Sequence, residues 1–376
     1  MLFKGGGKLQ KGDIGRLVTG VGGEYNGFTS KDFTAYYEIL PADKIETGLM
    51  IESERMTNAA FDPREVESER TVVISEREGN ENDPEFLTME ELFQTTFRFH
   101  PYRWSEGGVK EDLSRITRDD LFAHYRQYYV PSNALLVVVG PHQPKKMLLR
   151  IEEYFGELAT SSKPPEPNVT EPLQKGERRV DLRLPSEADY IKVAYRAPGF
   201  DNDDVFALVM LDAILSGVRL LALGPGQASG RSTRLHRALV EKKVATQVSS
   251  EFWPTIDPSV FTLDLTVWEG CSIDKAEKLL LEEIEKIQRH PPSKGELDKA
   301  LAQVRAQYAY ALDGIIRQGF LIGIFELIIS FETIASLVPK LLLVTPEMVS
   351  EVARKYLTPA NRTVCRCIGI RNSHAS

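Results

Sequence analysis

Two glutamates on one short stretch have the spacing best suited to chemistry in this sequence. Glu69 and Glu76 lie seven positions apart in E-V-E-S-E-R-T-V-V-I-S-E-R-E-G-N, residues 65–80, which has no glycine or proline before Gly79. Seven steps of about 100° come to roughly 700°, about 20° short of two helical turns, so both carboxylates share one helix face. Carboxylates held in this way can bind a metal or serve as acid and base. An ordinary solvated helix face has the same pattern, so both interpretations stay open on spacing alone.

Length and composition describe a globular chain with room for two domains. Its 376 residues are 42% hydrophobic and 27% charged, and the formal net charge is −8. This acidic balance argues against a nucleic-acid partner, because nucleic-acid binders normally carry a basic face. Three cysteines, Cys271, Cys365 and Cys367, imply no disulfide framework. The most apolar region, 320–329, contains Glu326 and is well short of the roughly 20 residues that cross a bilayer, so we expect a buried helix and no membrane partner.

Hydrophobic periodicity predicts helices and strands in both halves of the chain. The first half has strand character at both ends of 26–40, helices at 42–57, after Pro63 and from Thr117, and a buried strand at 133–140. The second half alternates helices with strands at 179–184, 190–195, 246–252, 260–267 and 363–370. Residues 160–176 between the halves are rich in proline, serine and charge without periodicity, which predicts a linker.

The two halves repeat one pattern at domain scale. A capped helix from Thr117 leads to Y-Y-V-P-S-N at 128–133 and then to an apolar strand. A capped helix from Thr345 leads to Y-L-T-P-A-N at 356–361 and then to the last strand. We therefore expect an internal duplication, with domains at 1–159 and 177–376 joined by the linker.

Several short segments, taken in order, resemble the pitrilysin, insulinase and mitochondrial processing peptidase family of zinc proteases, most closely its bacterial two-domain members. They are M-L-F-K-G at 1–5, N-G-F-T-S at 26–30, residues 69–76, H-P-Y at 100–102, residues 129–140 with Y-F-G at 154–156, and R-S-T-R-L at 231–235. Each is weak alone, whereas their order and spacing are specific and cover nearly the whole chain. The resemblance implies an α+β fold of two homologous domains, each with a mixed or antiparallel sheet and helices packed on one face, which would face each other across a peptide-binding chamber.

The resemblance also implies a zinc site. The family binds zinc through an inverted motif, H-x-x-E-H, whose glutamate is the general base, together with a distant glutamate ligand. In such proteins a segment like M-L-F-K-G commonly follows the second histidine, and the third ligand comes about 75 residues later. By this match Glu76 would be the third zinc ligand, and Glu69 would orient a histidine or the substrate. This sequence, however, contains no H-x-x-E-H, and none of its six histidines forms an i, i+4 pair.

Two explanations fit the missing motif. In the first, which we expect, the first domain is N-terminally truncated and the motif precedes Met1, so the chain as given is an inactive part of a zinc-dependent metalloendopeptidase that hydrolyses peptides. In the second, the chain is a non-catalytic subunit that pairs with a homologous peptidase and only binds substrate. Because tetrahedral zinc sites need three protein ligands, we expect no tight zinc binding by this chain in either case. We also expect poor solubility, since truncation would expose a sheet edge and apolar faces.

Substrate contacts are a further implication of the resemblance. Asn26, Phe28 and Thr29 match an edge strand beside the zinc, where an extended peptide substrate would pair through its backbone; a plain hairpin strand is the alternative. Arg234 matches an arginine that binds substrate backbone together with a tyrosine. Thr246 stands here in the place of that tyrosine, so an ordinary surface arginine is equally compatible with the sequence.

Two remaining features are expected to have no part in catalysis. His100 is followed by a proline and aromatic residues, which favours a structural or capping histidine over a ligand. The glycines of 224–230 could suggest a phosphate-binding loop, but the segment lacks the G-K-[ST] ending that such loops carry, so we expect no nucleotide there.

Overall fold

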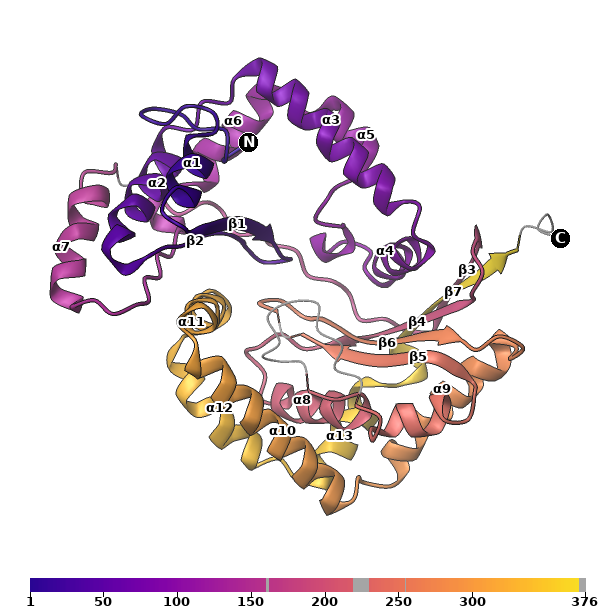
Figure 1. Ribbon diagram of the computed structural model, residues 1–376. Helices are drawn as coiled ribbons and strands as arrows, with labels where there is room; N and C mark the ends of the chain where they lie inside the picture. Colours follow the sequence, from indigo (N-terminus) through magenta and orange to yellow (C-terminus); the bar gives the residue numbers. More distant parts are fainter. Residues whose placement is uncertain (160–161, 219–229, 254, 372–376) are drawn as a thin grey trace. The chain divides into compact units, whose positions relative to one another are not determined.

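The computed structural model describes residues 1–159, 162–218, 230–253 and 255–371 (Figure 1). Contacts between residues divide the chain into unit 1, formed by Met1–Gly79 and Glu106–Asn168, and unit 2, formed by Asn80–Ser105 and Val169–Ser376. Residues 80–105 therefore pack with the second half of the chain although they lie in the first half of the sequence. The loop considered at 224–230 falls outside the described residues, apart from Gly230.

Unit 1 is mostly helical around one β-hairpin. Strands β1 and β2 pair in antiparallel register, from Glu24 opposite Ile39 to Thr29 opposite Thr34. Helix α6 begins with a capping box between Thr117 and Asp120, which confirms the capped start predicted there. The elements of unit 1 are α1 (Asp13–Thr19), β1 (Glu24–Thr29), β2 (Thr34–Ile39), α2 (Ile45–Thr57), α3 (Pro63–Asn80, whose last residue falls in unit 2), α5 (Lys110–Arg115), α6 (Arg118–Tyr128) and α7 (Pro144–Phe155), with short 3-10 turns η1 (Ala42–Lys44) and η3 (Pro131–Asn133).

The prediction of a buried strand at 133–140 is wrong. After η3 the chain is irregular, and Leu135 and Leu136 are each 40% exposed. The physical reason is pairing: none of the described strands lies in register with this segment, and a strand needs a neighbour both for its backbone hydrogen bonds and for burial. Leu135 and Leu136 are therefore exposed, and the valines at 137–139 are only half-buried.

Unit 2 is built on a five-stranded mixed sheet. Its order is β3-β7-β4-β6-β5, with β3 and β7 parallel and the other neighbouring pairs antiparallel. Strand β7 follows Y-L-T-P-A-N and lies between β3 and β4. The strands are β3 (Arg178–Pro185), β4 (Tyr190–Ala197), β5 (Ala245–Phe252), β6 (Ser259–Val267) and β7 (Arg362–Ile370), which confirms the five strands predicted for this half.

Helices cover both faces of this sheet, as Figure 1 shows. Alternate residues of β4, among them Ile191, Val193 and Tyr195, pack into the main core with α8, α9 and α13. The intervening Ala194 faces α4 in a smaller core with Leu92. The helices are α4 (Pro84–Thr96), α8 (Asp204–Leu215), α9 (Ile273–Arg289), α10 (Lys294–Asp313), α11 (Ile315–Ile328), α12 (Glu332–Leu342) and α13 (Pro346–Tyr356), with turns η2 (Pro101–Arg103), η4 (His236–Val240) and η5 (Pro359–Asn361). The α+β class with mixed and antiparallel sheets is thus confirmed. The expectation of helices on one face only does not hold for unit 2, because α4 covers the second face of its sheet.

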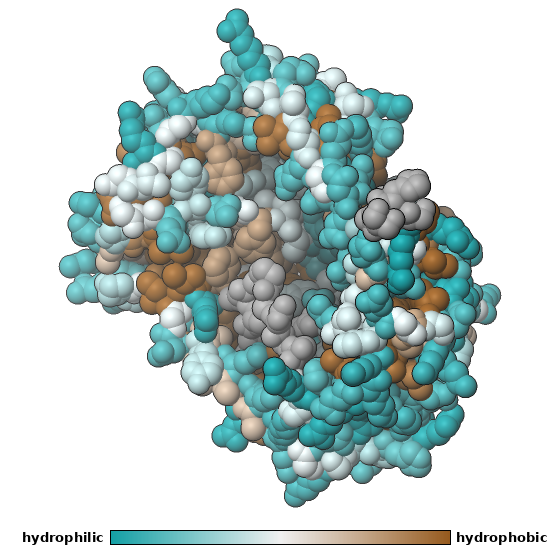
Figure 2. Space-filling model, turned by 45° about the vertical axis from the view of Figure 1, so that its right-hand side comes forward, coloured by the Kyte–Doolittle hydropathy of each residue, from teal (hydrophilic) through white to brown (hydrophobic). Residues whose placement is uncertain are grey.

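The visible surface is mainly hydrophilic, with hydrophobic residues in smaller patches (Figure 2). Among the described residues no single helix has the length and apolar content to cross a membrane. The bent pair α11 and α12, which meet at 88°, passes that test by length and composition only. Leu321, Ile324 and Phe325 of α11 are buried within unit 2.

Candidate functional site

Helix α3 carries the two glutamates singled out in the sequence. Its start is fixed locally, because Pro63 suits a first helical turn and the Asp62 carboxylate accepts the backbone N–H of Arg64 at 2.8 Å. The helix runs unbroken for 18 residues with only Val66 and Arg77 buried. Glu69 and Glu76 therefore do lie on one continuous helix, on the shared face that their spacing requires.

Glu69 is tied to the first residues of the chain. Its carboxylate accepts a hydrogen bond from the Lys4 ammonium at 2.7 Å, and this bond raises the pKa of Lys4. Burial lowers the pKa of the half-buried Met1 amine, while the negative charge of Glu69 acts in the opposite direction. Leu2 packs with Val66 of α3 in a small core, which fixes the segment in place. The beginning of the chain is thus held beside the face of α3 that carries Glu69.

Glu76 is exposed, and its carboxylate makes no hydrogen bond or ion pair within the described part of the chain. No cluster of three or more histidine, cysteine, aspartate or glutamate side chains suited to a metal occurs among those residues. Glu69 and Glu76 supply carboxylates but no imidazole joins them, and a tetrahedral zinc site takes at least three protein ligands. The described residues therefore do not fit a complete zinc site.

Strand β1 brings together Asn26, Phe28 and Thr29. Asn26 accepts the backbone N–H of Gly27 through its own side chain, Phe28 meets Phe33 edge to face with ring centroids 5.9 Å apart, and the Thr29 hydroxyl lies 3.3 Å from that of Thr34. Among the described strands β1 pairs with β2 alone, so its other edge has no strand partner. Such an edge can accept an extended peptide through backbone hydrogen bonds.

His100 has the structural role expected of it. It caps the 3-10 turn η2 by accepting the backbone N–H of Tyr102 at its Nδ1, 3.3 Å away. Its Nε2 lies 3.2 Å from a carboxylate oxygen of Asp257, and the residue is only 5% exposed. The prediction of a capping histidine is confirmed.

Arg234 is engaged within unit 2. Its guanidinium donates to both carboxylate oxygens of Glu296 at 2.9 to 3.1 Å, and Glu296 also closes the capping box of α10 with Ser293. Burial acts to raise the pKa of Glu296, but the Ser293 backbone N–H and the Arg234 guanidinium outweigh it and hold that pKa below its usual range. Thr246 is exposed on β5.

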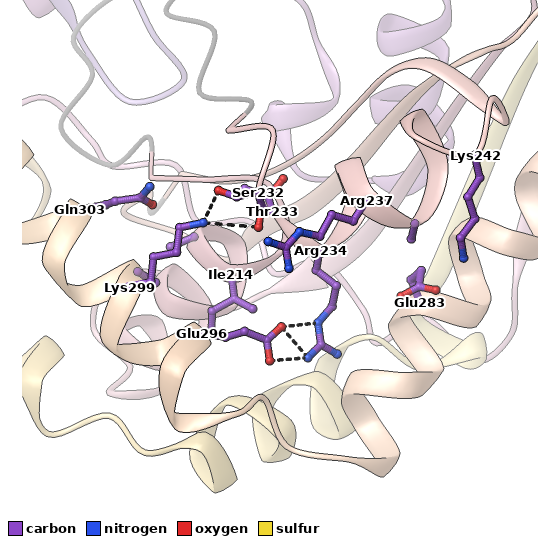
Figure 3. Close-up of a pocket in the computed structure, with 13 residues that line it drawn as sticks. Ile214, Ser232, Thr233, Arg234, Arg237, Lys242, Glu283, Glu296, Lys299 and Gln303 are labelled. Atoms are coloured by element: carbon purple, nitrogen blue, oxygen red, sulfur yellow. Dashed lines mark hydrogen bonds and ion pairs between the residues drawn. The ribbon is translucent and has the colours of Figure 1, made fainter.

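Arg234 also lines a cavity of about 380 Å³ in unit 2, which Figure 3 shows from one side. The lining comes from α8, from the segment around η4, and from α9 and α10. Its cations Arg237, Lys242 and Lys299 were not singled out by sequence reasoning. The three-residue spacing of Arg234 and Arg237 could have predicted that they share one helix face. No local pattern predicts that Lys299, which lies on a different helix, joins them.

Comparison with known proteins identifies the family. The profile described as "Insulinase (Peptidase family M16)" matches residues 1–105, and that described as "Peptidase M16 inactive domain" matches residues 115–304, half of the chain. The chain belongs to the M16 peptidase family. This confirms the family inferred from the short segments, which pitrilysin-type and processing peptidases share.

Individual M16 relatives are distant in sequence and close in fold. A zinc protease of Helicobacter pylori, PqqE, is 27% identical over 83% of this chain and 68% of its own length. The beta subunit of the mitochondrial processing peptidase of Lentinula edodes is 24% identical over 84% of this chain and 67% of its own. A crystal structure of a Helicobacter pylori protease superposes with a TM-score of 0.92 at 24% identity, covering 98% of this chain and 87% of that one. The last comparison shows a shared fold.

Proposed function

We propose that this M16 chain takes part in zinc-dependent peptide hydrolysis and contributes Glu76 as one zinc ligand, with the two histidines and the glutamate base supplied by sequence outside these 376 residues. The observation that carries the proposal is the Lys4–Glu69 ion pair at 2.7 Å, with Leu2 packed against Val66. Residues joined ahead of Met1 would start beside α3, on the side where Glu69 lies. Zinc in named relatives supports the cofactor assignment.

The side chains of α3 have different tasks in this proposal. Glu76 is exposed and unpaired among the described residues, so its carboxylate is available to a ligand. Glu69 is already paired with Lys4, which suits a positioning residue better than a direct ligand. The edge of β1 that lacks a partner among the described strands, at Asn26, Phe28 and Thr29, would hold an extended peptide by backbone pairing. Arg234 would contact substrate only after exchanging its bonds with Glu296.

The test is to read the coding DNA upstream of the Met1 codon and to express the longest in-frame product. We expect an H-x-x-E-H that ends at the join, about one zinc per chain by elemental analysis, and hydrolysis of a fluorogenic peptide. Glu76→Gln should remove the zinc, because it removes an anionic ligand. Glu67→Gln is the matched control, because nine helical steps of about 100° place Glu67 on the opposite side of α3 from Glu76.

Two results would contradict the zinc assignment. One is a stop codon or unrelated residues ahead of Met1. The other is an E76Q variant that retains its zinc while E67Q behaves in the same way.

A second candidate is a non-catalytic subunit that pairs with an active homologue and binds substrate. It is favoured by the sequence itself, which contains no H-x-x-E-H. The processing peptidase beta subunit among the relatives supports heteromeric assembly of this chain. In that case the chain, tagged and expressed together with an M16 homologue that carries H-x-x-E-H, should co-purify with that homologue at a fixed ratio. The complex, but not the chain alone, should then contain zinc.

A further inference from the structure

The cavity in unit 2 carries more positive charge than its own residues neutralise. Four cationic side chains line it against two carboxylates, although the whole chain has a formal net charge of −8. The cations are Arg234, Arg237, Lys242 and Lys299, and the carboxylates are Glu283 and Glu296. A local excess of two positive charges in an acidic protein calls for a physical reason.

Both carboxylates are already committed to other partners. Glu296 receives the bidentate Arg234 guanidinium at 2.9 to 3.1 Å. Glu283, which is 9% exposed, pairs with Lys286, a residue outside the cavity lining. Neither carboxylate is therefore available to neutralise the remaining cations.

Three cations are left without an anionic partner. Within the described part of the chain, the side chains of Arg237 and Lys242 make no hydrogen bond or ion pair. Lys299 donates only to neutral groups of Ser232, its hydroxyl and its carbonyl oxygen, the latter at 3.4 Å. In Figure 3, Arg237 and Lys299 extend from η4 and α10 into the same space. All three residues are exposed to solvent. An anion that enters beside Arg237 and Lys299 is attracted by both charges.

We propose that this cavity binds a small oxyanion group, a carboxylate or a phosphate, carried by a ligand. The guanidinium of Arg237 offers a planar fork that matches either group, and Lys242 and Lys299 add mobile point charges. A volume of about 380 Å³ is that of a small-molecule site and exceeds one inorganic ion, so the ligand extends beyond the anionic group.

This role differs from the substrate-backbone contact considered for Arg234. Arg234 is neutralised by Glu296, whereas the excess charge belongs to Arg237, Lys242 and Lys299. The inference does not depend on zinc or on hydrolysis. It can therefore hold or fail independently of the proposed function.

Titration calorimetry on the chain tests the proposal with three probes: pyrophosphate, a tetraglutamate peptide blocked at both ends, and the equally blocked tetraglutamine peptide. We expect at least one anionic probe to bind at a single site, more weakly as salt is raised, and the glutamine peptide not to bind. Binding of pyrophosphate alone would assign a phosphate ligand, and binding of tetraglutamate would assign an acidic peptide. Absence of binding by both anionic probes overturns the proposal.

Paired variants separate the cavity from general charge. Arg237→Gln together with Lys242→Gln should weaken binding of the anionic probe at least tenfold. Lys275→Gln together with Arg305→Gln removes the same charge from exposed positions of unit 2 outside the lining, and should leave binding unchanged. Equal weakening by both pairs would mean that net charge attracts the probes, which also overturns the proposal. Unfolding curves of both variants establish that each is folded.

Discussion

One carboxylate in the predicted linker is the anchor whose removal we expect to matter most for unit 2. Glu171 accepts three successive backbone N–H groups, from Arg98 at 2.8 Å, Phe99 at 2.8 Å and His100 at 3.0 Å. Its side chain is 2% exposed, and Arg196 lies 3.8 Å away. The carboxylate thus holds the chain that leaves α4 against the residues that lead into β3.

The cost of losing this anchor follows from its hydrogen bonds. Glu171→Gln keeps the shape but turns one acceptor oxygen into an NH₂ donor that faces backbone N–H groups. A hydrogen bond to a charged group contributes about 1.5–3 kcal/mol, and at least one is lost, so we expect a loss of about 2–4 kcal/mol in the free energy of unfolding. Glu171→Ala should cost at least as much, because three buried donors lose their acceptor.

The effect should depend on pH with a definite sign. Burial acts to raise the pKa of Glu171, but the N–H groups of Arg98, His100 and Phe99 outweigh it, so the folded-state pKa lies below the usual value. A carboxyl with a depressed pKa stabilises the fold at pH values above its unfolded pKa of about 4.3, and that contribution is lost as pH falls through the folded pKa. The difference between the wild type and E171Q should therefore be largest near neutral pH and shrink in acid.

Urea unfolding followed by tryptophan fluorescence measures this difference, because Trp104, Trp253 and Trp268 all belong to unit 2. Glu166→Gln is the control: Glu166 lies in the same segment, its side chain is 73% exposed, and its loss should leave the midpoint unchanged. Equal midpoints for E171Q and the wild type at pH 7, or a difference that grows in acid, would refute the reasoning.

Three further predictions concern other parts of the molecule. Lys192 is 3% exposed and donates to Asp264 at 2.7 Å and to Glu85 at 3.2 Å. Lys192→Met should lower the free energy of unfolding by about 3 kcal/mol, because it leaves the Asp264 charge uncompensated. Adding Asp264→Asn should restore most of that stability in the same urea assay. Backbone amides of 135–139 should exchange with solvent far faster than those of 364–367 in β7, as hydrogen-exchange mass spectrometry would report; similar protection would contradict the unpaired state of 135–139. Titration of the 376-residue chain with zinc should show no tight stoichiometric site, and a site of one zinc per chain would contradict this.

The sequence predicted unit 2 well because its signals are local. Each of the five strands is a short β-branched or apolar run bounded by turns, and the capping residue Thr345 identifies the start of α13. The sequence predicts a linker at 160–176, because a single carboxylate that accepts three backbone N–H groups adds no periodic pattern to the sequence. Glu171 shows that an irregular segment can still be a fixed part of the fold.

Of the candidate site, the sequence predicted only what residue spacing along one helix determines. Seven-residue spacing is enough to place Glu69 and Glu76 on one helix face, and the structure has them on α3. Lys4, the partner of Glu69, is 65 positions away in the sequence, and only the packing of the first residues against α3 brings the two together. The cations of the unit 2 cavity are likewise gathered from separate elements, so their common charge excess appears only in three dimensions.

The segment 133–140 explains how a sound pattern gave a wrong prediction. Both units run from a capped helix through Y-x-x-P-x-N into an apolar segment, and in unit 2 that segment is β7, with β3 on one side and β4 on the other. An apolar run is typical of a central strand, but such a strand forms only where other strands can pair with both of its edges. In unit 1 the described strands β1 and β2 pair only with each other, so Leu135 and Leu136 stay exposed. An unpaired apolar segment of this kind is a template for strand addition, and it is where we expect this chain to associate or to gain most from an added strand.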